Sequence, residues 1–342
     1  MESPESWFHR RATFYVEAQI LFHLNQAGVL QLLSNGRAYT ARQVADALKL
    51  DFHAVDALLD YVFEIDDLLE RDDGLAYSLS EFGTKIVERF ADSAPGANRR
   101  SINMFDVRVG AYGPVWQNIG RMLSGDGRYG QEFHREGRYA ENGVSKLARN
   151  FMKPLTEQID ELGVDSACEI GLTTGLLERL GEKYPSLHLY GLDKSRAAVD
   201  RSAAAAAKLR NANWIHADFF DFDAWCGSIG RDQRGLIYSL HFHELMAHGE
   251  DKFIAALREL KRRLPGWVLL ALEQPRLPHS ERPAVPETLW LYAQSNILIH
   301  HLIGNGRILS RDEWVRLGEA AGCRSTERPC SYLGYQAFTF YF

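Results

Sequence analysis

The sequence lacks several features that would assign it to a specialised class of protein. It has no apolar run of about 18 or more residues, so no membrane-spanning helix is expected. Its four cysteines are scattered, without the spacing of a metal site or a disulfide framework. The N-terminus is acidic and polar, unlike a secretory signal peptide. These absences favour a protein of the reducing cytoplasm that works away from membranes.

Basic residues are also fewer than acidic ones. Lysine and arginine number 39 against 45 acidic residues, which gives a net charge of -6. This balance argues against a general nucleic-acid binder, because phosphate contact needs basic surface. What the chain does have is a globular composition, 46% hydrophobic and 25% charged, over 342 residues. That length is enough for two domains with a large core.

Residues 1–95 have the pattern of a mainly helical domain. Thr40 and Asp51 are predicted to cap two successive helices, and an Asp-Asp-Gly turn then precedes a strand. Helix, helix and β-hairpin make a winged-helix pattern. Residues 40–73 carry ten acidic side chains against three basic ones, so we expect this domain to form a homodimer rather than bind DNA. Residues 96–155 are interpreted as a helical linker and substrate cap.

The remaining residues, 156–342, alternate between apolar strands and helices. This rhythm predicts an α/β domain built on a Rossmann-like sheet. The expected strands are 167–170, 187–192, 213–216, 236–240, 267–273 and a terminal hairpin that ends with 337–342.

A glycine-bounded turn stands at the end of the first of these strands. Glu169 precedes Gly171 and Gly175, and a later strand ends in Asp193. Glycines let the backbone approach a ligand closely, and Asp193 can accept hydrogen bonds from two ribose hydroxyls. Glu169 would repel a phosphate but suits an amino-bearing ligand. The turn therefore favours a nucleoside cofactor that carries an amino group.

The turn resembles motif I of the class I S-adenosylmethionine (SAM) methyltransferases, which reads acid-x-Gly-x-Gly-x-Gly. Thr173 departs from that pattern. Asp218-Phe219 and the segment 306–314 are similar to elements of the SAM-dependent O-methyltransferases with an N-terminal dimerisation domain. The resemblance implies a seven-stranded methyltransferase domain behind a winged-helix dimerisation domain, with a homodimer as the working form. It also implies SAM binding by Glu169, Gly171, Gly175, Asp193, Asp218, Phe219 and Ser239.

The chemistry is expected just after the fourth strand. There the O-methyltransferases carry Leu-His-Asp-Trp, whose histidine is a general base for a phenol. This chain has His243-Glu244 in place of His-Asp, with an additional His241 two residues earlier. Glu244 stands in for the acid. His241 has two interpretations, a proton acceptor or an inward-facing structural residue.

Two further histidines, His300 and His301, lie on a later helix. This arrangement resembles the iron-dependent α-keto acid C-methyltransferases, such as phenylpyruvate and 2-ketoarginine methyltransferases. Carried over, iron or another divalent transition metal is held by His243 and by one of His300 and His301. Only one can face the pocket, because neighbouring helical residues diverge by about 100°. We favour His300.

The resemblance also suggests a substrate. An α-keto acid would be held through its carboxylate by Arg128, with Asn296 on the substrate-facing helix. The product would be a β-methyl α-keto acid for a non-proteinogenic amino acid or a peptide natural product. One alternative is a metal-free O-methyltransferase of a small phenolic or hydroxy metabolite, with His243 as general base. Another is a protein that binds SAM without catalysis.

Overall fold

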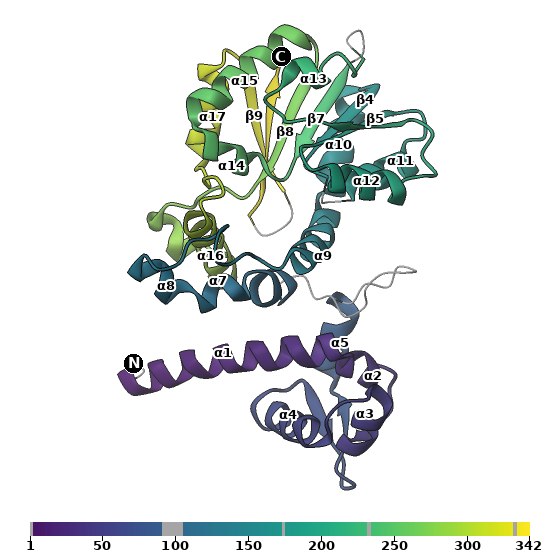
Figure 1. Cartoon of the computed structure of the whole chain (residues 1–342), viewed down its shortest axis with the longest axis vertical. Helices are drawn as coiled ribbons and strands as arrows, with labels where there is room; N and C mark the ends of the chain where they lie inside the picture. Colours follow the sequence, from purple (N-terminus) through teal and green to yellow (C-terminus); the bar gives the residue numbers. More distant parts are fainter. Residues whose placement is uncertain (1–2, 91–104, 173–174, 231–233, 331–333) are drawn as a thin grey trace. The chain divides into compact units, whose positions relative to one another are not determined.

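The computed structural model describes residues 3–90, 105–172, 175–230, 234–330 and 334–342. The chain divides into two compact units, Met1–Val144 and Ser145–Phe342 (Figure 1). Each unit has its own hydrophobic core.

The N-terminal unit begins with a long helix and a winged-helix arrangement. Its elements are α1 (Pro4–Ala27), α2 (Val29–Leu33), β1 (Tyr39–Thr40), α3 (Ala41–Leu48), α4 (Phe52–Ile65), β2 (Leu69–Arg71), β3 (Ala76–Leu79) and α5 (Glu81–Phe90). The three strands form a small antiparallel sheet in the order β1-β3-β2. Thr40 caps α3 in a capping box with Gln43, and Asp51 caps α4. Both predicted caps are confirmed.

The rest of this unit is helical and runs on into the second unit. It comprises η1 (Asp106–Ala111), α7 (Gly113–Gln117), α8 (Ile119–Ser124) and α9 (Gly137–Ala148). Helix α9 crosses the boundary between the two units. The structure thus groups the chain in two, and the role of residues 96–155 as a linker and substrate cap remains a prediction.

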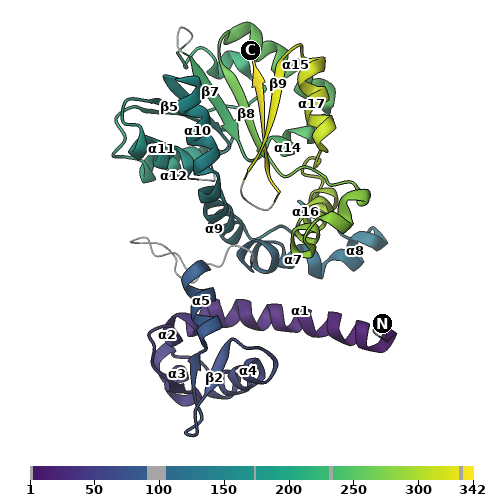
Figure 2. The ribbon, with the colours of Figure 1, turned by 180° about the vertical axis from the view of Figure 1, so that it is seen from behind.

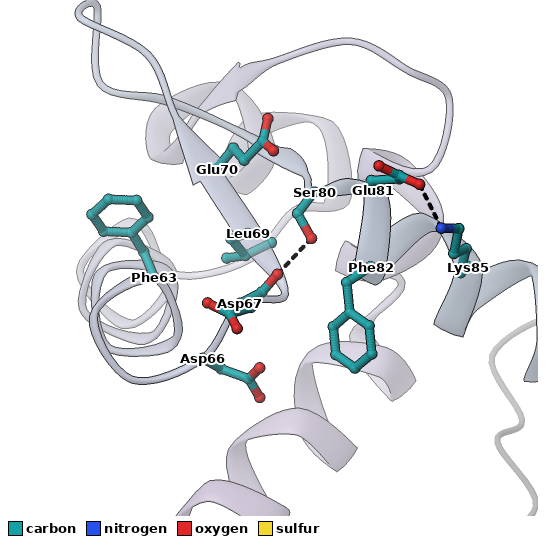
Figure 3. A pocket seen from close by; sticks show the side chains of 9 residues that line it. All are labelled: Phe63, Asp66, Asp67, Leu69, Glu70, Ser80, Glu81, Phe82 and Lys85. Carbon is teal, nitrogen blue, oxygen red and sulfur yellow. Dashed lines mark hydrogen bonds and ion pairs between the residues drawn. The ribbon is translucent and has the colours of Figure 1, made fainter.

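A hollow of about 520 Å³ opens on the winged-helix region (Figure 3). Four of its nine lining residues are acidic and one is basic: Phe63, Asp66, Asp67, Leu69, Glu70, Ser80, Glu81, Phe82 and Lys85. Lys85 is paired with Glu81 at 2.5 Å. The acidic lining disfavours contact with a nucleic-acid phosphate, in line with the composition of residues 40–73.

The C-terminal unit is a three-layer α/β domain. The described residues form a seven-stranded sheet in the order β6-β5-β4-β7-β8-β10-β9. Strands β4 to β8 pair in parallel, and β10 lies antiparallel between β8 and β9. The strand order reverses beside β4, where open sheets of this kind bind ligands at the carboxyl ends of their strands.

The strand bounds lie within a residue or two of those predicted. They are β4 (Ser166–Ile170), β5 (His188–Asp193), β6 (Ala212–His216), β7 (Gly235–Ser239), β8 (Val268–Glu273), β9 (Arg324–Pro329) and β10 (Gln336–Tyr341). The helices are η2 (Arg149–Phe151), α10 (Met152–Leu162), α11 (Leu176–Lys183), α12 (Arg196–Ala205), α13 (Phe222–Trp225), α14 (Phe242–Leu245), η3 (Met246–His248), α15 (Glu250–Arg263), η4 (His279–Ala284), α16 (Glu287–Ile303) and α17 (Arg311–Ala320) (Figure 2).

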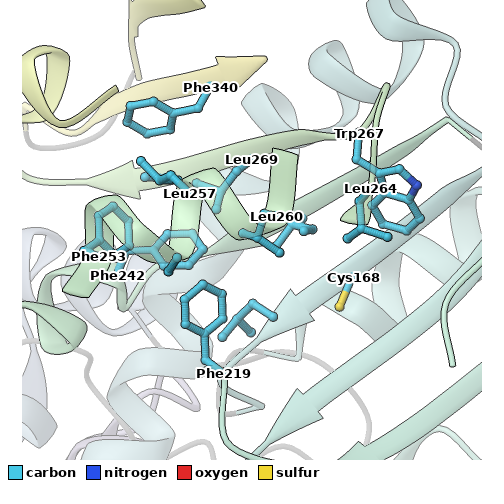
Figure 4. Close-up of a cluster of buried hydrophobic side chains, with 14 of the residues drawn as sticks. Cys168, Phe219, Phe242, Phe253, Leu257, Leu260, Leu264, Trp267, Leu269 and Phe340 are labelled. Atoms are coloured by element: carbon cyan, nitrogen blue, oxygen red, sulfur yellow. The ribbon is translucent and has the colours of Figure 1, made fainter. Parts of the chain in front are cut away.

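Apolar side chains cover both faces of this sheet. Helix α15 buries Phe253, Ala256, Leu257 and Leu260, the spacing of one helical face. These side chains pack with Trp267 and Phe340 in the core of one face (Figure 4). Helices α10 and α11 supply the core of the other face. Each fully buried Leu or Phe contributes roughly 1.5–3 kcal/mol, so the two cores stabilise the sheet that carries the turns at its edge.

None of the described helices has both the length and the hydropathy needed to cross a bilayer.

Candidate functional site

The glycine turn predicted to hold the cofactor follows β4 directly. Gly171 has φ +85° and donates its N–H to the carbonyl of Leu192 at 2.9 Å. A Cβ on Gly171 would lie 3.3 Å from the ring of His241. Gly175, at φ +67°, is the N-cap of α11. Both glycines occupy left-handed backbone that other residues adopt only with strain. Thr173 lies outside the described residues.

Glu169 is buried at the base of this turn, with 1% of its surface exposed. Its carboxylate accepts hydrogen bonds from the Leu177 N–H at 3.1 Å and from the Tyr238 hydroxyl at 3.3 Å. Burial and the nearby Glu169 charge raise the pKa of Tyr238 well above its ordinary value, so this phenol stays protonated. Glu169 thereby ties β4 to α11 and β7. Contact with an amino-bearing ligand remains a prediction.

Two more predicted cofactor acids end neighbouring strands. Asp193 accepts from the Leu172 N–H at 2.9 Å and from the Ser195 N–H at 2.7 Å. Asp218, after β6, accepts from the Phe220 N–H at 2.8 Å. The two carboxylates thus follow adjacent parallel strands at the same edge of the sheet.

The remaining two cofactor candidates are buried. Phe219 is stacked on Trp225, with ring centroids 6.2 Å apart, and belongs to the hydrophobic core. Ser239 ends β7 and donates its hydroxyl to the Ile170 carbonyl at 2.7 Å. The same hydroxyl accepts the His241 N–H at 2.9 Å. Ser239 therefore links the end of β4 to the turn that carries the histidines.

The turn after β7 brings together three residues that were predicted to take part in catalysis or metal binding. One ligand atom from each of His241, His243 and Glu244 lies within 4.8 Å of the others. The structure adds Glu273, the last residue of β8. Its Oε2 lies 2.6 Å from His243 Nδ1, and its Oε1 accepts the His243 backbone N–H at 3.0 Å. Both carboxylate oxygens thus hold one histidine.

This pairing sets the electrostatics of His243, whose side chain is nearly buried. Burial by itself lowers the pKa of His243, but the Glu273 carboxylate, its hydrogen bond and the charge of Glu244 together raise that pKa above the ordinary value. With Nδ1–H donated to Glu273, the neutral ring carries its lone pair on Nε2. The arrangement suits a proton acceptor whose charged form is stabilised.

His300 meets His243 from helix α16. The two rings lie edge to face, with centroids 4.5 Å apart and planes at 77°. His300 is 6% exposed, and its Nδ1 donates to the Asn305 carbonyl at 2.7 Å. His301 is on the exposed side of the helix. Asn296, one turn earlier, donates to the Gln274 amide oxygen at 3.4 Å.

Sequence reasoning overlooked Glu273, Gln274 and Asn305. A signal for the first was available, because an acid at the carboxyl end of a strand was the basis for choosing Asp193 and Asp218. Glu273 ends the neighbouring strand in the same way. The carbonyl of Asn305 has no sequence signal, because its contribution comes from the backbone.

Arg128, predicted to hold a carboxylate, belongs to the N-terminal unit. Its backbone N–H donates to Glu132 at 2.7 Å. Its role toward a substrate remains a prediction.

A divalent transition metal fits the donor chemistry of the histidine turn, which offers two imidazoles and a carboxylate. Among the described residues, His241, His243 and Glu244 form the group of three ligand-type side chains that lie close enough to share an ion. A ligating histidine commonly donates its other ring N–H to a carboxylate or carbonyl, as His243 and His300 both do. The residues are thus compatible with a metal, and equally with a metal-free base.

No family model and no curated sequence matches the chain. Solved structures do match over its whole length. Human N-acetylserotonin methyltransferase in complex with SAM has a TM-score of 0.72 at 18% identity, covering 100% of this chain and 99% of the other. A putative O-methyltransferase from Nostoc punctiforme PCC 73102 has a TM-score of 0.72 at 14% identity and covers 100% of both chains. The mitomycin 7-O-methyltransferase MmcR has a TM-score of 0.66 at 16% identity, covering 98% and 97%. The likeness confirms the predicted fold, a Rossmann-like domain with the fold of these methyltransferases, preceded by a mainly helical region.

Proposed function

We propose that the protein is a SAM-dependent methyltransferase that moves a methyl group to a hydroxyl of a small molecule, with His243 as general base. The observation that carries this proposal is the His243–Glu273 pair. A buried imidazole with its Nδ1–H on a carboxylate and a raised pKa is suited to removing an acceptor proton.

When bound, SAM would supply the methyl group through cleavage of its sulfonium S–CH3 bond, with S-adenosylhomocysteine as the leaving group. The residues proposed to hold it fit that role by chemistry. Asp193 would accept from the ribose hydroxyls and Asp218 from the adenine amino group. Gly171 and Gly175, both at positive φ, leave room for close approach of the backbone. Glu169 supports the turn and adds negative charge beneath it.

The chain's own contribution to catalysis is proton removal and orientation. His243 Nε2 takes the hydroxyl proton, and the ring becomes an imidazolium that Glu273 stabilises through Nδ1. In the second bond, the His243 backbone N–H donates to Glu273. This bond holds the backbone of His243, and hence the start of its side chain, in place. A positioned base of this kind contributes about 10²–10⁴-fold to the rate.

The structure changes the order of the two hypotheses drawn from the sequence. The sequence favoured metal-assisted C-methylation of an α-keto acid. The bond to Glu273 fits both hypotheses, because a metal-ligating histidine commonly makes the same bond. Similar structures that are named as O-methyltransferases favour the metal-free one. Transfer to a hydroxyl of a small phenolic or hydroxy metabolite is therefore the first candidate.

The α-keto acid reaction is retained as a second candidate because of the histidine cluster. His241, His243 and Glu244 lie within sharing distance of one ion, and the His300 ring is 4.5 Å from that of His243. Iron or another divalent transition metal at these residues would act as a Lewis acid on the keto acid. His300, rather than the exposed His301, is the proposed partner of His243. Arg128 and Asn296 are the proposed substrate contacts.

The test is methyl transfer from labelled SAM to two panels, one of phenols and hydroxy metabolites and one of α-keto acids. Protein purified without added metal is assayed with and without a strong chelator, and its metal content is measured. We expect transfer to a hydroxyl acceptor at an unchanged rate in chelator. Transfer to keto acids alone, abolished by chelator, would establish the second candidate. SAM binding with no turnover on either panel would indicate a non-catalytic SAM-binding protein.

We also propose a homodimer formed through the N-terminal unit. Its support is the first half of α1, where Trp7, Phe8 and Phe14 are 44%, 69% and 51% exposed. Aromatic side chains on a solvent-facing helix are typical of a protein contact. Light scattering on the full chain should give twice the mass of one chain, and Phe8→Ser with Phe14→Ser should shift it toward the monomer. A monomeric wild-type protein would rule this out.

A further inference from the structure

A short segment between α16 and α17 contacts both buried histidines. We propose that Asn305, Gly306 and Arg307, here called the bridging segment, act as a positioning element that sets the two imidazoles relative to one another. The inference rests on the proposed function of His243. It gives a physical role to the start of the segment 306–314, whose pattern had only a resemblance to explain it.

The first contact fixes His300. Its Nδ1–H donates to the carbonyl of Asn305, five residues further along the chain, at 2.7 Å. Helix α16 ends between the two, with Gly304 in the left-handed conformation as its C-cap. The Asn305 carbonyl thereby selects the ring tautomer of His300 that places the lone pair on Nε2.

The second contact fixes the backbone of His243. The Arg307 N–H donates to the His243 carbonyl at 3.0 Å. Gly306, at φ +87°, lies so close that a Cβ would be 2.1 Å from that carbonyl oxygen and 2.6 Å from Glu244 Cα. Such distances involve backbone atoms that cannot turn aside, so any side chain at residue 306 would push the histidine turn away. The glycine permits a contact that holds His243 and Glu244 in place.

The guanidinium of Arg307 anchors the segment at two places. It is bonded to Glu250, the first residue of α15, and lies 3.2 Å from Glu313 Oε1 on α17. Glu313 also forms an ion pair with Arg276 at 3.1 Å and completes a capping box with Ser310. The segment is thus attached to the first turns of two helices that pack into the core of the sheet.

The exposure of the Arg307 ion pairs indicates whether they mainly stabilise the fold or mainly position the histidines. The Arg307 side chain is 43% exposed, and exposed ion pairs contribute only about 0–1 kcal/mol to stability. In contrast, a displacement of about 1 Å at a catalytic group costs on the order of 10²-fold in rate. Loosening this anchor should therefore affect turnover far more than unfolding.

Arg316 offers a matched control. It binds the other oxygen of the same Glu250 at 2.9 Å, but from α17 and with a side chain that is 60% exposed. Arg307→Ala and Arg316→Ala each remove one ion-pair partner of Glu250. Only the first removes a side chain that belongs to the bridging segment.

We expect Arg307→Ala to lower kcat about 10-fold or more with an unchanged KM for SAM, because the histidines lose their alignment. Arg316→Ala should stay within twofold of wild type, and Arg307→Lys should recover part of the loss. The three variants should unfold within a few degrees of wild type. Equal kcat losses in Arg307→Ala and Arg316→Ala, or no loss in either, would overturn the proposal.

A second measurement does not depend on turnover. In the full chain labelled with ¹⁵N-histidine, the imidazole spectrum of wild type should show His300 with a protected Nδ1–H. Arg307→Ala should broaden or remove that signal, and Arg316→Ala should keep it. An unchanged His300 signal in Arg307→Ala would refute the positioning role even if no acceptor is ever found. Absence of methyl transfer by wild type, with the spectral change present, would refute only the proposed function.

Discussion

Two halves of the same sheet edge are built in different ways. At the ends of β4, β5 and β6, the carboxylates of Asp193 and Asp218 accept hydrogen bonds from backbone N–H groups. At the ends of β7 and β8, side chains meet side chains, as in His243 with Glu273. In the first half, a substitution removes a proposed cofactor contact and leaves the proposed base untouched. In the histidine half, a substitution alters the proposed base or its partner, so single substitutions there should have larger effects on kcat.

The largest expected effect is that of His243→Ala. Loss of the general base should lower kcat by about 10³-fold, within the range for such groups, with SAM affinity within twofold of wild type. Radiolabelled methyl transfer and calorimetric SAM binding measure the two quantities. His188→Ala, an exposed residue at the opposite end of β5, is the control. A His243→Ala protein with wild-type kcat would end the proposal of a histidine base.

Glu273→Gln should lower kcat by about 10²-fold, because the ring of His243 loses its orientation and its counter-charge. The same change should shift the acid limb of the pH–rate profile. Glu273 raises the pKa of His243, and the base must be neutral to act. Removing that charge lowers the pKa, so activity should appear at lower pH. An acid limb that stays in place would assign it to another group.

The same substitution gives a stability test of the opposite pH sense. Because the folded-state pKa of His243 is raised, the pair contributes its full stabilisation below the unfolded pKa of about 6.5. That contribution is lost as pH rises through the folded pKa. The difference in unfolding free energy between wild type and Glu273→Gln should therefore be largest in acid and smaller at alkaline pH.

Asp193→Ala tests the half of the sheet edge formed by the ends of β4, β5 and β6. A hydrogen-bond acceptor with a charge is worth about 1.5–3 kcal/mol, so KM for SAM should rise roughly 10- to 100-fold. The kcat at saturating SAM should stay near wild type, since the histidine pair is untouched. Initial rates over a range of SAM concentrations separate the two. A fall in kcat with KM for SAM unchanged would remove the distinction between the two halves of the sheet edge.

The smallest effect is expected from a paired comparison on α16. His300→Gln should lower kcat about 10-fold through lost alignment of His243, and His301→Gln should leave it within twofold. Their burial differs although they are adjacent in sequence. Metal analysis of both variants sharpens the test. A bound metal lost with His300→Gln alone would favour the α-keto acid candidate.

Local signals account for what could be predicted from the sequence. The glycine turn, the acids at strand ends and the caps at Thr40 and Asp51 each depend on a few adjacent residues. The strands followed from apolar runs buried on both faces. The His243–Glu273 pair joins residues 30 positions apart. The sequence marks Glu273 as an acid at a strand end, but the strand order is needed to show that it lies beside His243. Phe219 stays a predicted cofactor contact, and what the structure adds is that its ring lies in the hydrophobic core.

Ser239 has a consequence for any attempt to change the methyl acceptor of the proposed reaction. One hydroxyl serves the end of β4 and the start of the histidine turn together. A library that randomises residue 239 would disturb the proposed cofactor and acceptor sites at once, and its variants would be hard to interpret. Diversity placed on α16 around Asn296, with His300 kept, leaves that shared hydroxyl intact. Directed evolution of this protein should therefore vary the helix and keep the serine.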